Sequence, residues 1–103
     1  MKFMKLLERR EMKRTELLDK AKEIITGARE EHYGSPEDNF RNIAMLWTAY
    51  LDDGDTSIVI HPEDVAIMMI LMKCARLKSD ERHEDSWIDI AGYASCGSEI
   101  VNG

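Results

Sequence analysis

Apolar residues recur at steps of three and four along most of this chain, which is the spacing of a helix that buries one face. Residues 4–31 predict one long helix or two consecutive helices, and Thr15 suits an N-cap if a second helix starts there. The apolar positions of this segment are Leu17, Leu18, Ala21, Ile24, Ile25 and Ala28. Gly34 then fits the left-handed position that commonly follows a helix.

Two further helices are predicted from one start signal, a polar residue followed by proline and two acids. Ser35-Pro36-Glu37-Asp38 opens the first of them, whose core face is Phe40, Ile43, Ala44, Trp47 and Leu51. His61-Pro62-Glu63-Asp64 opens the second, which runs from Val65 to Leu77. Because apolar residues occupy nearly every face from Val65 to Met72, we expect this helix to be central and the most buried.

A fourth helix is predicted from His83 onward, since Ile88, Ala91 and Ala94 recur at three-residue steps. The connection 78–82 is short, so the third and fourth helices should form an antiparallel hairpin. The expected fold is all-α, a four-helix bundle in a single domain, 1–103, with its core in 15–101 and a basic N-terminal helix extension in 1–14. Seven Met, two Trp and a long first helix give more apolar surface than one small bundle covers, so we expect a dimer or higher oligomer.

The charge balance excludes some classes of protein. Fourteen Lys and Arg against twenty Asp and Glu give a net charge of −6, which argues against a general nucleic-acid-binding protein.

Cys74 and Cys96 lie far apart within helical patterns and are expected to be buried free thiols. The longest apolar run has eight residues and is too short to cross a membrane, so we expect a soluble, intracellular protein.

Two carboxylates interrupt the apolar pattern of the fourth helix. Asp85 and Asp89 are four residues apart, so they point the same way and repel unless a divalent cation or cationic side chains compensate them. Lys73 and Arg76 continue an apolar stripe of the third helix, and the hairpin places Lys73 toward Asp89 and Arg76 near Glu84 or Asp85. One interpretation is a salt-bridge network that fastens the two helices. The other is an anion-plus-metal pocket, in which carboxylates hold Mg²⁺ and the two cations meet phosphate oxygens.

Aromatic and histidine side chains add candidates for a nucleotide site. His32 and Tyr33, in the turn before Gly34, suit stacking on a base or donation to phosphate, although Tyr33 can equally pack over the next helix start. His83 either caps the fourth helix or reaches a ligand beside Asp85.

The chain resembles a family of small bacteriophage and prophage proteins of unassigned function over roughly residues 28–100. The motifs that carry this similarity are Glu31-His32-Tyr33-Gly34-Ser35-Pro36-Glu37-Asp38-Asn39-Phe40, Pro62-Glu63-Asp64-Val65, Lys73-x-x-Arg76-Leu77 and His83-Glu84-Asp85-Ser86-Trp87-x-Asp89-x-Ala91-Gly92-Tyr93. More loosely, it is similar to phage nucleotide-modification-associated domains and to MazG-type all-α nucleoside triphosphate pyrophosphohydrolases. The MazG resemblance implies a helical, oligomeric, Mg²⁺-dependent enzyme that hydrolyses (d)NTPs, although Asp85-x-x-x-Asp89 stands here where that type carries Glu-x-x-Asp.

These observations lead to three hypotheses for a protein in the cytoplasm of a bacterial host cell. The first is a phage-type nucleotide-binding protein that acts as a pyrophosphohydrolase, in which catalytic Asp85 and Asp89, together with Glu63, hold Mg²⁺. The second is a non-catalytic sponge that sequesters a cyclic nucleotide immune signal of the host, with stacking on Tyr33 or Tyr93 and no metal. The third is a helical adaptor that binds another protein. Three or four converging carboxylates favour the enzyme, whereas carboxylates already paired with Lys73 and Arg76 favour binding or structure.

Overall fold

The computed structural model describes residues 12–27, 34–55 and 57–103, and these residues form four helices and no strand. The helices are α2 (Arg14–Thr26), α4 (Pro36–Leu51), α5 (Pro62–Ser79) and α6 (Glu84–Asn102). The all-α class is therefore confirmed for the described part of the chain. None of the helices found there is long and apolar enough to cross a membrane.

The predicted first helix, 4–31, is confirmed over the extent of α2, while residues 4–11 and 28–31 lie outside the described residues. Thr15 is not the N-cap of this helix. α2 begins one residue earlier, at Arg14, and Lys13 is its N-cap without a side-chain hydrogen bond to the first turn.

α4 and α5 begin where the sequence predicts. The Ser35 hydroxyl accepts a hydrogen bond from the backbone N–H of Asp38 at 3.2 Å, and Pro36 is the first residue of α4. At the start of α5, the Asp64 carboxylate accepts a hydrogen bond from the backbone N–H of His61 at 2.9 Å. Each bond satisfies a backbone donor that the helix itself leaves free, which explains why both helices start at the Pro-acid-acid signal.

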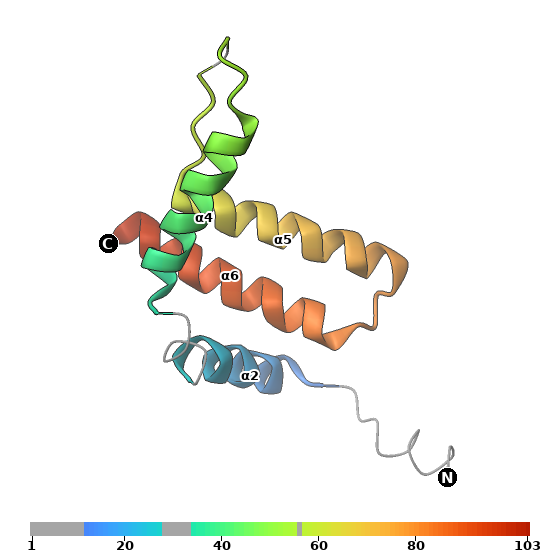
Figure 1. Ribbon diagram of the computed structural model, residues 1–103. Helices are drawn as coiled ribbons and strands as arrows, with labels where there is room; N and C mark the ends of the chain where they lie inside the picture. The colour runs from blue at the N-terminus through green and yellow to red at the C-terminus, as the bar shows by residue number, and fades with distance from the viewer. Residues whose placement is uncertain (1–11, 28–33, 56) are drawn as a thin grey trace.

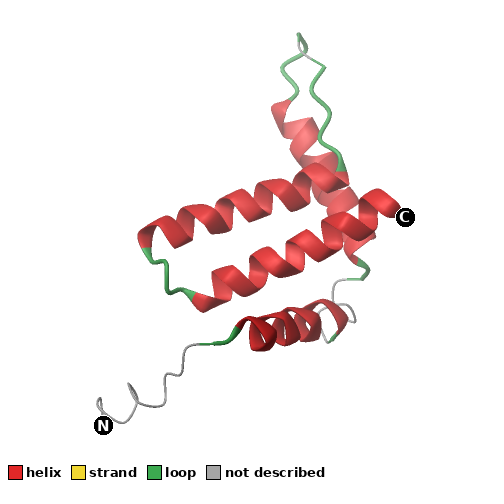
Figure 2. Ribbon diagram, turned by 180° about the vertical axis from the view of Figure 1, so that it is seen from behind, coloured by secondary structure: helices red, strands yellow, loops and turns green. Residues whose placement is uncertain are grey.

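The helices are arranged around an antiparallel hairpin of α5 and α6, as predicted (Figure 1; Figure 2). α2 lies along the side of α6 that faces away from α5. α4 crosses the hairpin at the end where α5 begins and α6 finishes, and its C-terminal half extends beyond the hairpin. α6 is therefore in contact with all three of the other helices.

The core lies where α4 crosses the hairpin. It consists of Phe40 and Ala44 from α4 and Val65 and Ala66 from α5, all 5 % exposed or less. α6 approaches α5 closely in the same region, because a Cβ on Gly97 would lie 2.9 Å from the Cβ of Ala66. A glycine inside a helix commonly has such a packing reason, and here it sets the spacing of the hairpin.

The prediction that α5 is the central and most buried helix is wrong. Val65 and Ala66 are buried, but Ile67, Met68, Leu71 and Met72 are 55 %, 38 %, 61 % and 51 % exposed. α4 and α6 cover two sides of α5, and no other described helix packs on its remaining side. An apolar sequence shows that a helix can be covered, and the arrangement of the other helices decides whether the same chain covers it.

The expectation of two buried thiols is also wrong, although both cysteines are free, as predicted. Cys74 is exposed and Cys96 is only partly buried. Cys74 follows Met72 on α5 and shares the side of that helix that no described helix covers.

Candidate functional site

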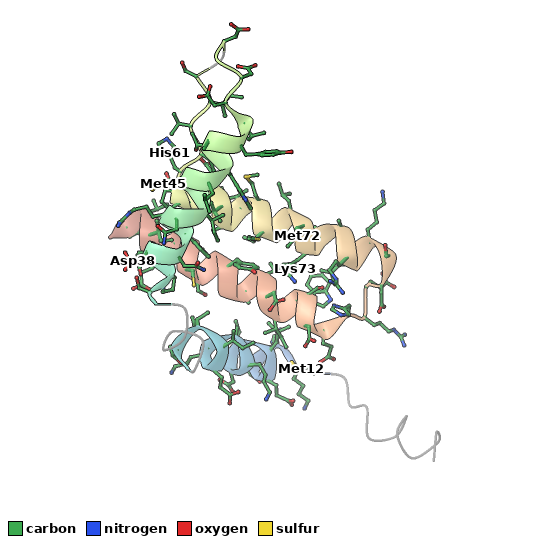
Figure 3. The ribbon with its side chains drawn as sticks, in the orientation of Figure 1. Met12, Asp38, Met45, His61, Met72 and Lys73 are labelled. Carbon is green, nitrogen blue, oxygen red and sulfur yellow. The ribbon has the colours of Figure 1, made fainter. Side chains whose placement is uncertain are left out.

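The centre of the candidate site is an ion pair between α5 and α6. The Lys73 Nζ lies 3.0 Å from the Asp89 Oδ2, and the two side chains are only 16 % and 26 % exposed. Figure 3 shows Lys73 between the two helices of the hairpin. The contact predicted from the antiparallel spacing is therefore confirmed. Because the pair is partly shielded from water, each charge depends on the other more than in a surface ion pair.

Asp89 also lines a cleft on the other side of α6, bounded by α2, the start of α4 and α6. The cleft measures about 570 Å³ with its open mouth included. Apolar residues of α2, α4 and α6 form most of its wall. The lining residues are Ala21, Ile24, Ile25, Gly34, Pro36, Asn39, Phe40, Ile88, Asp89, Gly92, Tyr93 and Cys96.

Aromatic and glycine residues shape the inner part of this cleft. Tyr93 follows Asp89 by one helical turn, and its ring lies 6.2 Å from that of Phe40, centroid to centroid, at an interplanar angle of 40°. Gly92 is buried and faces α2, because a Cβ there would lie 3.4 Å from the Cγ2 of Ile25. The absence of a side chain on Gly92 leaves the space that the cleft occupies.

Polar contacts hold the first turn of α6 beside this cleft. The His83 Nδ1 and the Oγ of the fully buried Ser86 are hydrogen-bonded at 2.7 Å. The Glu84 carboxylate accepts a hydrogen bond from the backbone N–H of Met12 at 3.2 Å, which ties the segment before α2 to α6. His83 occupies the N-cap position of α6, but its side chain makes no hydrogen bond to the backbone of the first turn, and its predicted contact with a ligand stays a prediction.

The structure brings together only some of the predicted site residues. Tyr93 and Asp89 share the cleft, and Lys73 reaches Asp89 from α5. Arg76 and Asp85 are exposed, and neither forms an ion pair within the described residues. His32 and Tyr33 lie outside the described residues.

The carboxylates predicted to hold Mg²⁺ do not converge. Glu63 is in the first turn of α5 and Asp85 is in the first turn of α6, so the antiparallel hairpin separates them by most of the length of a helix. α5 has 18 residues, which corresponds to about 27 Å. Among the described residues there is no group of three His, Cys, Asp or Glu side chains that fits a metal ion. A site made of Glu63, Asp85 and Asp89 is therefore not formed.

Several residues of the cleft were not predicted as site residues from the sequence. Asn39 and Cys96 line it beside Phe40 and Tyr93, yet each sits in an ordinary amphipathic pattern. One signal was available, because Gly92 interrupts a helix and an internal glycine often marks close packing or function. The contribution of α2 is long-range in sequence and leaves no such local mark.

Proteins of two mycobacteriophages are similar to this chain. The "Gene 55 protein" of Mycobacterium phage D29 is 44 % identical over 84 residues, which cover 82 % of this chain and 52 % of that protein. The "Gene 55 protein" of Mycobacterium phage L5 is 46 % identical over 78 residues, covering 76 % of this chain and 47 % of that protein. This chain thus spans about half the length of these two relatives. No solved structure matches it significantly.

The expected similarity to small bacteriophage proteins is confirmed by these relatives. The looser similarity to MazG-type enzymes stays a prediction. The family described as "Domain of unknown function (DUF6378)" matches residues 16–101, which is most of the chain, and the chain therefore belongs to this family.

Proposed function

We propose that this protein binds a nucleotide, or a related phosphorylated small molecule, with the base in the cleft between α2, α4 and α6. The observation that supports this most directly is the composition of the cleft. Apolar and aromatic walls enclose three polar side chains, Asn39, Asp89 and Tyr93. Small-molecule sites commonly have this character, a mostly apolar pocket with a few polar groups that fix orientation.

A nucleobase has flat apolar faces and a polar edge, and the cleft offers groups for both. Tyr93, which is partly exposed and rests against the buried Phe40 ring, provides aromatic surface for the faces. The Asn39 amide can donate and accept hydrogen bonds, as asparagine does with the edge of adenine, while Asp89 accepts from an exocyclic amine. Lys73 pairs with Asp89 from α5, so a ligand phosphate that binds Lys73 would share it with Asp89.

The geometry favours binding over magnesium-dependent hydrolysis. Asp89 is already neutralised by Lys73, and neither Asp85 nor Glu63 joins it in a three-ligand group. We keep a MazG-type pyrophosphohydrolase as the second proposal because Asp89 is a carboxylate that faces the cleft. A sponge for a cyclic nucleotide would use the same cleft without metal.

A thermal-shift screen tests these proposals. The ligands are free nucleosides, nucleoside mono- and triphosphates and cyclic nucleotides, each with and without Mg²⁺. A ligand at about 100 times its Kd stabilises the protein by about 2.7 kcal/mol, which is several degrees for a domain of this size. Stabilisation by a nucleotide without metal supports binding, whereas stabilisation by triphosphates only with Mg²⁺ followed by pyrophosphate release supports the enzyme. No shift with any ligand contradicts all three nucleotide proposals.

A matched pair of variants on α4 places the ligand. Asn39→Ala removes an amide from the cleft, and Asn42→Ala makes the same change three residues further, at an exposed position that does not line it. We expect Asn39→Ala to lose most of the ligand-induced shift and Asn42→Ala to retain it. Equal shifts for both variants would contradict binding in this cleft even if the protein binds nucleotides elsewhere.

A further inference from the structure

The outer side of α5 carries an apolar face that no described helix covers. Ile67, Met68, Leu71 and Met72 occupy positions that share one face of a helix, and they are between 38 % and 61 % exposed. The sequence from Val65 to Met72 contains no charged residue. Isolated apolar side chains on a surface need no explanation, but a contiguous apolar helix face does.

A second apolar face lies on the part of α4 that extends beyond the hairpin. Met45, Leu46 and Tyr50 share one side of this helix and are 65 %, 69 % and 88 % exposed. Further along the chain, Ile58 and Val59 precede α5 and are 48 % and 58 % exposed. Figure 1 and Figure 2 show the C-terminal half of α4 projecting from the end of the hairpin where α5 begins. Figure 3 labels one methionine of each face, Met45 and Met72.

We propose that a second copy of this chain covers both faces, so that the projecting half of α4 from each protomer packs on α5 of the other. Together the two faces form the α4–α5 surface, which consists of Met45, Leu46, Tyr50, Ile67, Met68, Leu71 and Met72. This proposal is independent of the proposed nucleotide cleft, because the cleft lies on the side of α6 that faces α2 and not α5.

The size of the α4–α5 surface supports this occupant. Its seven large residues are 38–88 % exposed and together present several hundred Å² of surface, comparable with or larger than the largest apolar patch of about 300–600 Å² on a typical monomer. In a stable protein–protein interface of standard size, each partner buries about 800 Å². A single further copy therefore suffices to cover the surface.

The shape of the molecule also favours a second copy as the occupant. A two-fold interface needs a surface that is complementary to itself, and a projecting helix next to an exposed flank meets that need when each arm lies on the flank of the other copy. The protein has a net charge of −6, which opposes self-association at long range, so the attraction between two copies must come from apolar side chains. The seven residues of the α4–α5 surface are all uncharged.

The test is the molar mass of the full chain in solution, measured by light scattering after size-exclusion chromatography. Concentrations from about 0.1 to 100 µM are appropriate, because interfaces of this size span micromolar to picomolar affinities. We expect a dimer. Leu71→Lys places a charge within the α4–α5 surface and should weaken the dimer by at least tenfold. Val101→Lys makes the same change at a residue of α6 that is similarly exposed, 67 % against 61 %, and should leave the dimer intact.

A second experiment tests the crossed arrangement and guards against misfolded variants. Leu46→Glu and Leu71→Lys should each give monomers with unchanged circular dichroism, and an equimolar mixture should restore a dimer. Restoration is expected because the glutamate on α4 of one copy then faces the lysine on α5 of the other.

Three results would overturn the proposal. If the wild-type protein is a monomer over the whole concentration range, a second copy does not cover the α4–α5 surface. A dimer that Leu71→Lys leaves intact would place the interface elsewhere. A mixture that stays monomeric would exclude the packing of α4 on α5 of the partner copy.

Discussion

The two sides of α6 are packed differently. On the side of α5, a Cβ added to Gly97 would lie 2.9 Å from the Cβ of Ala66. On the side of α2, a Cβ added to Gly92 would lie 3.4 Å from the Cγ2 of Ile25, and an open cleft lies beside it. The α5 side contains the fully buried Val65. On the α2 side, Ile24 lines the cleft and is 37 % exposed.

This difference follows from how the helices are connected. α5 and α6 are joined by residues 80–83 alone, so their closure costs little entropy and their side chains can pack tightly. α2 reaches α6 from more than fifty positions away in the sequence and covers it less completely. The close-packed side acts as the scaffold, and the loosely packed side provides the space in which a ligand can bind without disrupting the core.

The largest effect that would test this comparison is expected for Gly97→Ala. The added Cβ would meet the Ala66 Cβ at 2.9 Å, so the hairpin must open. Overpacking of this kind costs about 1–3 kcal/mol, which outweighs the gain of up to about 1 kcal/mol from replacing glycine in a helix. Chemical denaturation followed by circular dichroism measures the loss. Adding Ala66→Gly should recover part of it, and an unchanged unfolding midpoint for Gly97→Ala would show that the two helices are not closely packed.

The ion pair gives the next effect. Asp89→Asn leaves Lys73 partly buried without its counter-charge and should lower the free energy of unfolding by about 1–2 kcal/mol, less than for a fully buried pair because both side chains are partly exposed. The double variant Lys73→Met with Asp89→Leu removes both charges and should lie within about 1 kcal/mol of wild type. A double variant that is less stable than Asp89→Asn would show that the ion pair itself stabilises the hairpin.

Hydrogen exchange compares the two sides of α6 directly. Backbone amides of α2 should exchange at least about tenfold faster than the protected amides of α5 and α6, a difference of about 1.4 kcal/mol in opening free energy, because α2 can detach without breaking the core. Amide exchange followed by NMR gives this comparison residue by residue. Equal protection in all three helices would mean that α2 opens only when the whole domain unfolds.

The smallest effect, and one of opposite sign, is expected for Gly92→Ala. Its Cβ would make an ordinary contact with Ile25 at 3.4 Å, so the helical gain should dominate and stabilise the protein by about 0.5 kcal/mol. The melting temperature of Gly92→Ala, compared with that of Gly97→Ala, measures this difference, and the two variants are a matched pair because they make the same change on one helix. A destabilised Gly92→Ala variant would show that the α2 side is as tightly packed as the α5 side.

Much of the local structure follows from the sequence. The starts of α4 and α5 are encoded by Ser35-Pro36 and His61-Pro62 with the acids that follow, because capping involves only neighbouring residues. The Lys73–Asp89 contact was also predictable, since helical spacing and a short connection fix which turns of the two helices face each other. The metal set with Glu63 and Asp85 failed for the same geometric reason, because these residues start adjacent antiparallel helices.

What the sequence determined by itself was therefore the set of helices, the starts of α4 and α5 and the register of the hairpin, all of which depend on residues close together along the chain. Only the tertiary structure decided which faces are covered. Whether Leu71 and Met72 are buried depends on how many helices pack on α5, and the cleft at Asn39 exists because α2, α4 and α6 meet from distant parts of the sequence. Periodicity identifies an apolar face, but the number and direction of its neighbours are set by the packing of the whole chain.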